Sequence, residues 1–525
     1  MGESSDTLAM LPDLLATPTP VEVEPVTPTR PHTLRDRAAE ALDLAGKHVH
    51  FIGIGGSGMS GLAQMFAGRG AVVSGSDRES SDVVAALVAK GIHVHFDQAT
   101  GRLPDRCDLV VASAAVKPDH PQMLAAADRG ITSLLYAEAL GRAMIGATGI
   151  AVAGTHGKST TTAMLGCALT DAGLDPNVIV GATCPQLTQG CLKPRATASG
   201  FRLGSATIPS GSLKGRPGIL VAEACEYNRS FHNFRPTLAC INNVEADHLD
   251  VYGTLDAVVQ SFHDFAGLLP AAAEGGRLLI GHEGAHRREI TAGLACEVET
   301  IGWNPGADWT VAYDAAVRQV RVSHHGRVAA TWRNTLAGAH NAMNAATAFV
   351  LASWAGAPAE VVARSLAAFG GVDRRMQFMG ERPVQGGSVR VFDDYGHHPT
   401  EVEATLRAFR ESIAPEGGEG RLIVVFQPHQ HSRTRHLMGE FETSFSQADV
   451  VLVPHIYFVR DSLEEKQKVA ADELVDRLIA RGVNAMHLYP FKAIVDHLRA
   501  TARAGDTIVV MGAGDVWKVG RDFLA

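Results

Sequence analysis

The chain has 525 residues, of which 46% are hydrophobic and 6% aromatic, and its formal net charge is −9. This length predicts about two to four domains with aliphatic cores, and the acidic balance, without a basic run, argues against nucleic acid as a partner. The seven cysteines include no C-x-x-C pair, which indicates reduced thiols in a cytoplasmic protein and argues against a structural zinc site.

Residues 1–46 form the first segment, and residues 1–32 repeat Thr-Pro and Val-Glu pairs. Such a composition is typical of a disordered tail. The N-terminus has no positive stretch followed by an apolar core, so we expect no signal peptide. No apolar run reaches the roughly 20 residues of a membrane helix, so we expect no membrane partner.

From Lys47 onward, apolar strands alternate with helical patterns, as in α/β proteins whose parallel sheets are wrapped by helices. Three series of strands predict three domains, over residues 47–146, 147–371 and 372–525. Residues 188–218 are rich in Gly, Ser, Pro and Arg and predict a long surface loop or insertion. The expected strands are His48–Gly53, Val72–Ser76, Leu109–Ser113, one from Ile150, Ile219–Ala222, Leu238–Asn242, one from Val389, Leu422–Gln427, Val450–Val453 and Thr507–Met511.

A first glycine loop, Gly53-Ile-Gly-Gly-Ser-Gly58, follows a strand and opens a helix. Gly53, Gly55 and Gly58 fit the G-x-G-x-x-G pattern, whose glycines let the backbone approach a pyrophosphate at a helix N-terminus. Asp77 ends the next strand and is a candidate for bonding a ribose hydroxyl. Alone, the motif makes an NAD-dependent oxidoreductase the first hypothesis, beside a nucleotide-sugar site or a turn without a ligand.

A second loop, Gly154-Thr-His-Gly-Lys-Ser159, lies between an apolar strand and a Thr-rich helix. Backbone N–H groups, the Lys158 ammonium and the Ser159 hydroxyl are what a nucleoside triphosphate and its Mg²⁺ need. The usual pattern has a glycine five residues before Gly157, where this chain has Val152. The loop therefore favours a triphosphate site, although it departs from the usual pattern.

Two later strands end in polar residues, because Glu223 follows Ile219–Ala222 and His248 comes soon after Leu238–Asn242. Ligands bind at the carboxyl ends of strands in an open parallel sheet, so we expect both side chains to face Lys158 and hold metal ions. The alternatives are a solvated strand end for Glu223 and a packed or helix-capping histidine for His248. A triphosphate site weakens the oxidoreductase hypothesis.

The order and spacing of several segments resemble the Mur ligase family, the ATP-dependent amide ligases of peptidoglycan precursor synthesis. The resemblance covers about residues 47–525. The segments are Gly53–Gly61, Gly154-Thr-His-Gly-Lys158, Glu223-Ala-Cys-Glu-Tyr227, Glu245-Ala-Asp-His-Leu-Asp250, His340-Asn-Ala-Met-Asn344, Arg374-Arg375, Asp393-Asp-Tyr-Gly-His-His-Pro399, Phe426-Gln-Pro-His429 with Ser432-Arg-Thr434, and Gly512-Ala-Gly-Asp515.

The resemblance implies an N-terminal Rossmann-like domain for a UDP-sugar, a central P-loop ATPase-type domain with a parallel or mixed sheet, and a C-terminal Rossmann-like domain for an amino acid. The implied reaction joins L-alanine to the lactyl carboxylate of UDP-N-acetylmuramate through an acyl phosphate, with ATP and Mg²⁺, by a monomer or weak homodimer. The first loop then binds the UDP-sugar pyrophosphate instead of NAD. Because the family's phosphate loop needs only Gly-Thr-x-Gly-Lys-[Ser/Thr], Val152 fits it.

Carried onto matching positions, the resemblance implies site residues of several kinds. The catalytic residues are Lys158, His248, Arg375 and His397, and the metal ligands are Ser159, Glu223 and His248. The ATP-binding residues are Gly154, Thr155, His156, Gly157, Lys158, Ser159, Thr160, His340, Asn341, Asn344, Arg375 and Asp394. The UDP-sugar-binding residues are Gly53, Gly55, Gly56, Ser57, Gly58, Asp77 and Ser113, and the amino-acid-binding residues are Tyr395, His397, His429 and Arg433.

Three departures from the family pattern concern the predicted sites. Gln430-His431 stands where many members have Arg-Tyr, so one positive contact near the amino acid is missing. Cys225 and Asn228 lie in a segment that elsewhere reads Glu-Ala-Asp-Glu-Ser-Asp, and no lysine that could be carbamylated follows His248 before Lys466. The rival hypotheses are a ligase of the same family that attaches a preformed peptide, and a binding protein without catalysis.

Overall fold

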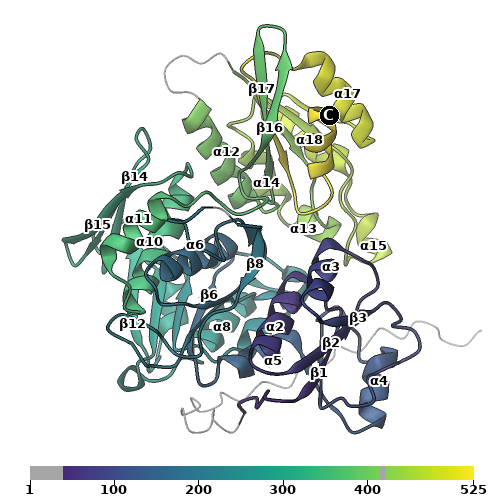
Figure 1. Cartoon of the computed structure of the whole chain (residues 1–525). Helices are drawn as coiled ribbons and strands as arrows, with labels where there is room; N and C mark the ends of the chain where they lie inside the picture. Colours follow the sequence, from purple (N-terminus) through teal and green to yellow (C-terminus); the bar gives the residue numbers. More distant parts are fainter. Residues whose placement is uncertain (1–39, 195, 414–419) are drawn as a thin grey trace, which may run out of the picture.

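The computed structural model describes residues 40–194, 196–413 and 420–525. Of the tail predicted for residues 1–46, residues 1–39 therefore lie outside the described residues. Three α/β units, each with its own sheet, follow one another along the chain, so the predicted fold class is confirmed. In Figure 1 the first unit is purple at the lower right, the second is mostly teal at the lower left, and the third is green to yellow above them.

The first unit has a five-stranded sheet in the order β3-β2-β1-β4-β5, and all its pairings are parallel. Its central strands β1 and β4 are apolar runs that are almost wholly buried, as expected where helices cover both faces of a parallel sheet. The elements are β1 (His48–Ile52), α2 (Ser57–Gly68), β2 (Val72–Ser76), α3 (Asp82–Ala89), β3 (His93–His95), β4 (Leu109–Ala112), α4 (Pro121–Asp128), β5 (Thr132–Leu135) and α5 (Tyr136–Met144).

The second unit has a ten-stranded mixed sheet in the order β15-β14-β13-β12-β11-β10-β6-β9-β7-β8. The strands from β13 to β7 run parallel, and β14, β15 and β8 add antiparallel edges. The strands are β6 (Thr148–Ala153), β7 (Asn177–Cys184), β8 (Ser199–Arg202), β9 (Ile219–Glu223), β10 (Leu238–Ile241), β11 (Arg277–Gly281), β12 (Glu297–Gly302), β13 (Trp309–Asp314), β14 (Gln319–His324) and β15 (Arg327–Arg333).

Residues of β6 pack into cores on both faces of the sheet, and the helix that follows β6 is buried along most of its length. This helix, α6, packs against α10 and α11; its small residues, from Thr160 to Ala163, let the helices approach closely. The helices are α6 (Lys158–Asp171), the 3₁₀ helix η1 (Tyr227–Asn233), α7 (Leu249–Tyr252), α8 (Leu255–Ala266), η2 (Ala272–Glu274), α9 (Arg287–Thr291), α10 (Ala339–Trp354) and α11 (Ala359–Ala367).

The third unit has a six-stranded sheet in the order β16-β17-β21-β18-β19-β20. β16 and β17 form an antiparallel hairpin, and the other pairings are parallel. The elements are β16 (Gln377–Val384), β17 (Gly387–Asp394), α12 (Pro399–Ile413), β18 (Leu422–Phe426), α13 (His431–His436), α14 (Met438–Ser444), β19 (Val450–Val453), α15 (Leu463–Lys466), α16 (Ala471–Ala480), β20 (Ala485–His487), α17 (Phe491–Thr501), β21 (Thr507–Met511) and α18 (Trp517–Leu524).

The strands expected from the sequence are confirmed, with small shifts at their ends. Apart from β8, which pairs with β7, the described part of residues 188–218 forms no helix or strand, so the predicted loop is interrupted by one short strand. Phe201 packs against Gly61 and Leu203 against Gly68, both on α2 of the first unit. Glycine on α2 leaves room for these side chains, a long-range contact that the local composition of the segment does not reveal.

Ordered structure begins before residue 47. Leu44 is buried in the core of the first unit, and the Glu40 carboxylate lies 3.1 Å from the Arg235 guanidinium. Within the part of the chain that the structure describes, no helix combines the length and the apolar character that crossing a membrane requires.

Candidate active site

The phosphate loop joins the buried strand β6 to α6. Gly157, the residue before α6, has φ = 81°, a left-handed conformation that glycine adopts without strain. A Cβ atom on Gly157 would collide with Asn344 Oδ1 of α10, so the position leaves no space for a side chain. Val152 is fully buried in β6 and lies outside the turn. The glycine missing from the usual pattern therefore falls at a position that belongs to the strand.

The Lys158 ammonium is held at the mouth of this loop. Its Nζ donates to the carbonyl oxygens of Gly154 at 2.7 Å and Thr155 at 3.0 Å, and lies 2.8 Å from Glu226 Oε2. Burial opposes the charge, but the nearby Glu226 carboxylate outweighs it and raises the pKa of Lys158 above its usual value. Lys158 therefore stays protonated and aimed at the loop.

The residues predicted as metal ligands lie beside Lys158. The Ser159 hydroxyl donates to Glu223 Oε1 at 3.0 Å, and Glu223 Oε2 accepts from the Gly181 N–H at 2.8 Å. The strand register explains this pairing, because Glu223 of β9 lies opposite Val152 of β6. A hydroxyl and a carboxylate are oxygen ligands of the type that Mg²⁺ prefers, so these residues fit that ion.

His248 approaches the same region from the end of β10. It precedes α7 with φ = 54°, and its Nε2 lies 3.9 Å from Glu226 Oε1. Its Nδ1 is buried without a hydrogen-bond partner. Burial lowers the pKa of His248, with the opposing attraction of Asp247 and Glu226, so a neutral imidazole is available as a metal ligand.

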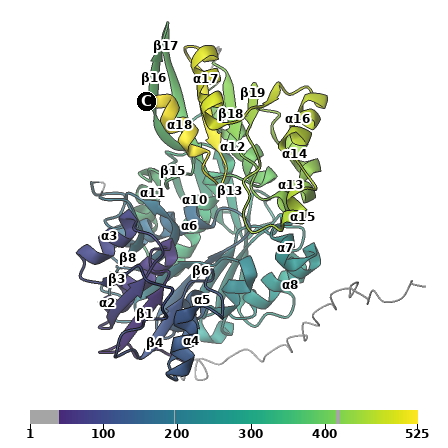
Figure 2. The same cartoon turned by 90° about the vertical axis from the view of Figure 1, so that its right-hand side faces the viewer.

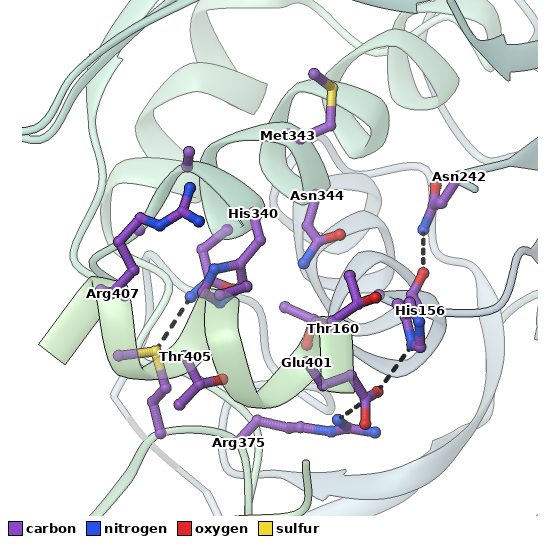
Figure 3. Close-up of a pocket in the computed structure, with 18 of the residues that line it drawn as sticks. His156, Thr160, Asn242, His340, Met343, Asn344, Arg375, Glu401, Thr405 and Arg407 are labelled. Atoms are coloured by element: carbon purple, nitrogen blue, oxygen red, sulfur yellow. Dashed lines mark hydrogen bonds and ion pairs between the residues drawn. The ribbon is translucent and has the colours of Figure 1, made fainter. Parts of the chain in front are cut away.

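A cavity of about 360 Å³ opens beside the loop, between the second and third units. Figure 3 shows His340 and Asn344 of α10 on one side of it and Glu401 and Thr405 of α12 on the other. Most of the predicted ATP-binding residues line this cavity: His156, Gly157, Ser159, Thr160, His340, Asn341, Asn344, Arg375 and Asp394. Gly154, Thr155 and Lys158 are not among the residues that line it. Burial raises the pKa of Asp394 to about 6, and burial, followed by Arg375, lowers that of His340 to about 4.

Glu401 connects the loop to the third unit. Its Oε1 lies 3.2 Å from His156 Nδ1 and 3.4 Å from the Arg375 guanidinium, as Figure 3 shows. On its other side, His156 Nε2 lies 3.5 Å from Glu245 Oε2. Burial disfavours a charged imidazole here, but Glu245 and Glu401 outweigh it and raise the pKa of His156 to about 9.

The first glycine loop is held in place by Asp77, which follows the next strand, β2. Asp77 Oδ2 accepts from the Gly55 N–H at 2.7 Å, and a Cβ atom on Gly55 would lie 2.8 Å from the same oxygen. Asp77 therefore braces the loop. Ser113 lies against Gly53, where a Cβ atom would come as close as 3.2 Å to the Ser113 Cβ atom. Gly53, Gly55 and Gly56 thus lie in the loop between β1 and α2, Ser57 and Gly58 begin α2, and Asp77 and Ser113 lie beside the loop.

The predicted amino-acid residues lie together in the third unit. The His397 ring is 5.4 Å from Tyr395 and 5.6 Å from His429, measured between ring centres. Arg433 Nη1 lies 3.1 Å from His429 Nδ1, and its Nε and Nη2 both donate to Asp247 Oδ1, at 3.0 and 2.9 Å. Arg433 is thus paired across the units, where α13 and α7 lie side by side (Figure 2).

Several polar residues of this region were not predicted from the sequence. Glu226, Glu245, Asp247, His398 and Glu401 hold the predicted residues through ion pairs and hydrogen bonds. Four of them belong to segments that carry the resemblance, and Glu401 follows the segment Asp393–Pro399. The sequence therefore pointed to these segments but not to the individual residues. Tyr136 is a further one: its hydroxyl lies against Gly58, and burial, followed by the nearby Glu223 and Cys225, raises its pKa.

The replaced dipeptide Gln430-His431 serves a structural purpose. Gln430 has φ = 67°, and its N–H donates to the Tyr457 carbonyl oxygen at 3.1 Å. The His431 N–H donates to Asp461 Oδ2 at 2.5 Å, and the Ser432 hydroxyl donates to Asp461 Oδ1 at 2.6 Å. These contacts fix the start of α13 and hence the position of Arg433.

A phosphate loop, neighbouring hydroxyl and carboxylate oxygens that fit a metal ion, and a cavity closed by another α/β unit define a nucleotide-dependent enzyme. Models of three domains match the chain: "Mur ligase family, catalytic domain" over residues 48–148, "Mur ligase middle domain" over 152–352 and "Mur ligase, glutamate ligase domain" over 374–514. The chain belongs to the Mur ligase family.

Relatives of known name are similar along nearly the whole chain. The UDP-N-acetylmuramate–L-alanine ligase of Agathobacter rectalis is 36% identical over 483 residues, which cover 91% of this chain and 97% of that protein. The enzyme of the same name from Kineococcus radiotolerans is 39% identical over 490 residues, covering 91% and 95%. These likenesses support the family assignment independently of the domain models.

Solved structures share the fold. The UDP-N-acetylmuramate-alanine ligase of Thermotoga maritima has a TM-score of 0.69 at 24% identity and covers 91% of this chain and 98% of its own. A murein peptide ligase of Psychrobacter arcticus has a TM-score of 0.65 at 26% identity, again covering 91% and 98%. The family assignment removes the oxidoreductase hypothesis, and the two activities named in these structures remain to be weighed.

Proposed function

We propose that the chain is an ATP-dependent ligase that joins L-alanine to the lactyl carboxylate of UDP-N-acetylmuramate, in the cytoplasm, as a monomer or weak homodimer. The observation that carries this proposal is the convergence of Lys158, Ser159 and Glu223 at one sheet edge beside the cavity, in a chain whose relatives over nearly its full length are L-alanine ligases by name. The cytoplasmic assignment is supported by seven cysteines that are all free thiols.

In the proposed reaction, the lactyl carboxylate attacks the γ-phosphorus of ATP and expels ADP, which gives an acyl phosphate. The alanine amine then attacks the acyl carbon and expels phosphate. Both steps bring anions together, so neutralisation and alignment of charge dominate the barrier. Lys158 and Arg375 provide the positive charges, and the N–H groups of the first turn of α6, which have no partners within the helix, face the phosphates.

The nucleoside is proposed to occupy the cavity between α10 and α12. His340, Asn341 and Asn344 offer polar contacts from α10, and Asp394 offers a carboxylate from the end of β17. The first glycine loop binds the UDP-sugar pyrophosphate, with Ser113 near the uridine. Tyr136 touches that loop and lies near Glu223, so it is suited to position the sugar relative to the phosphate loop.

Ser159, Glu223 and His248 would hold Mg²⁺, and the oxygen donors of Ser159 and Glu223 support this assignment. When bound, the ion neutralises phosphate charge and orients the carboxylate. Glu226 keeps Lys158 and His248 at fixed positions beside these ligands. The carbamylated lysine of other family members has no counterpart between His248 and Lys466 in this sequence.

The amino acid is proposed to lie among Tyr395, His397, His429 and Arg433. His397 Nδ1 lies 3.1 Å from the Tyr395 carbonyl oxygen, which can only accept, so Nδ1 carries the proton and Nε2 is left to accept from the alanine amine. Burial lowers the pKa of His397 to about 4. The ring is therefore neutral at pH 7 and does not repel an ammonium group.

A ligase that attaches a preformed peptide is the second candidate, favoured by the likeness to the murein peptide ligase structure. Phosphate release with ATP, Mg²⁺ and UDP-N-acetylmuramate tests both, with L-alanine, glycine, L-serine and a tripeptide as acceptors. We expect release with L-alanine. Release with the tripeptide alone would support the second candidate, and no release with any acceptor would reject both.

A further inference from the structure

Outside the proposed Mg²⁺ ligands, one group of side chains has the composition and spacing of a metal site. His156, Glu245 and His398 each offer a ligand atom, and these atoms lie within 4.8 Å of one another. His156 Nε2 is 3.5 Å and His398 Nδ1 is 3.9 Å from Glu245 Oε2. Zinc bonds of about 2.0–2.1 Å in a tetrahedron separate ligand atoms by about 3.3 Å, so small side-chain movements would complete the geometry.

The hydrogen bonds of both rings favour this use. His156 Nδ1 lies 3.2 Å from Glu401 Oε1, and His398 Nε2 lies 3.3 Å from the Ala246 carbonyl oxygen. Carboxylate and carbonyl oxygens only accept, so each of these nitrogens carries a proton. The other nitrogen of each ring therefore faces Glu245. Metal-binding histidines show this arrangement, in which a second oxygen fixes the tautomer and the ring orientation.

The burial of the His156 and His398 side chains also favours a bound metal ion. His156 Nε2 is a buried nitrogen without a hydrogen-bond partner, and the His398 side chain is nearly inaccessible. The Thr400 N–H approaches His398 Nδ1 only at 3.3 Å, while the Thr400 hydroxyl donates to Glu245 Oε2 at 2.5 Å and orients that carboxylate. A metal ion at this site would have to replace a proton on His156 Nε2.

We propose that His156, Glu245 and His398 form a three-ligand site for a divalent transition metal of the zinc type, with one coordination position open. The three ligands come from the phosphate loop, from the segment after β10 and from the turn before α12. A metal at this site joins the second unit to the third beside the nucleotide cavity. Its ligands differ from the proposed Mg²⁺ ligands Ser159, Glu223 and His248, so it adds to the proposed ligase function.

A titration with Co²⁺, as a spectroscopic substitute for Zn²⁺, tests the proposal. The full-length chain is first treated with chelator, and excess Mg²⁺ is then present to saturate the oxygen-ligand site. We expect one Co²⁺ per chain with the visible absorption of a four-coordinate ion. Glu245→Gln and His398→Ala should weaken binding by more than about tenfold, whereas His93→Ala, at an exposed position of the first unit, should bind as the wild type does.

The variant His398→Cys keeps the test decisive if His398→Ala folds poorly. Thiolate is a good ligand for this metal class, so His398→Cys should bind Co²⁺ again and add a sulfur-to-metal absorption band. Zn²⁺ should also raise the thermal midpoint of the wild type and of His398→Cys. If the wild type binds no Co²⁺ in excess Mg²⁺, or if Glu245→Gln and His398→Ala bind it unchanged, the position holds only a proton and the proposal is overturned.

Discussion

The ammonium of Lys158 lies 2.8 Å from one oxygen of Glu226, and the other oxygen of this carboxylate lies 3.9 Å from His248 Nε2. One buried carboxylate thus positions the lysine of the phosphate loop and the histidine at the end of β10. Neither residue is near the other in sequence. The lysine is a fixed part of the site, because its three partners all belong to the second unit.

Lys158→Ala tests the assignment of the two glycine loops. We expect turnover to fall by at least about 10³-fold, since a charge aimed at the transferring phosphoryl group is lost. Binding of UDP-N-acetylmuramate, measured by calorimetry, should stay unchanged because the first loop is intact. Loss of both properties in a folded variant would show that the loops have been assigned to the wrong ligands.

Gly157→Ala should abolish ATP binding. The added methyl group would collide with Asn344 Oδ1, and the left-handed backbone would add strain. Gly146→Ala is the matched control, because Gly146 also has a positive φ of 77° but open space around its Cβ position. Nucleotide fluorescence titrations of both variants separate the collision from the strain. Equal losses in the two variants would contradict the tight contact between the loop and α10.

Glu223→Gln should raise the Mg²⁺ concentration needed for half-maximal activity by about tenfold or more. The amide keeps the shape of the side chain but removes the charge that attracts the ion. Ser159→Thr retains the hydroxyl and should behave nearly as the wild type. An unchanged Mg²⁺ dependence in Glu223→Gln would remove this residue from the metal site.

Arg433→Ala should destabilise the protein by about 3–5 kcal/mol, because it leaves Asp247 buried without its partner. Chemical denaturation measures the change in the free energy of unfolding. The double variant Arg433→Met with Asp247→Leu should lose less stability than Arg433→Ala does. Lys492→Ala breaks a solvent-exposed pair with Asp496 and should change stability far less. A small loss in Arg433→Ala would mean that water replaces the guanidinium.

His156 should make stability depend on pH. Its pKa rises from 6.5 to about 9 in the folded chain, where Glu245, Glu401 and His398 surround it. The extra stability is fully present below pH 6.5 and is lost as the pH rises through 9, an amount on the order of 3 kcal/mol. His156→Gln should therefore be less stable than the wild type at pH 6, with the difference shrinking by pH 9.5, in chelator-treated samples. A constant difference would contradict the charged ring.

The sequence predicted the parts of the site that follow local rules. Lys158 and Ser159 follow a strand and begin a helix, and Glu223 ends a strand, so the parallel-sheet rule brought them to one edge. The sequence did not predict that Asp247 pairs with Arg433, or that Glu401 pairs with His156. These pairs join different units, and no local periodicity encodes how separate sheets face each other. β8 was missed for a similar reason, since its partners β7 and α2 supply the order.

The buried Val152 has a consequence for recognising such sites in other chains. In this protein the strand continues through that position, and its register with β9 sets Glu223 beside Ser159. A search that demands glycine there would reject the chain. A search for a short Gly-Thr-x-Gly-Lys turn, followed by a carboxylate at the end of an adjacent parallel strand, would retain it. The informative pattern is therefore a pairing between two strands, which a motif read along a single segment does not contain.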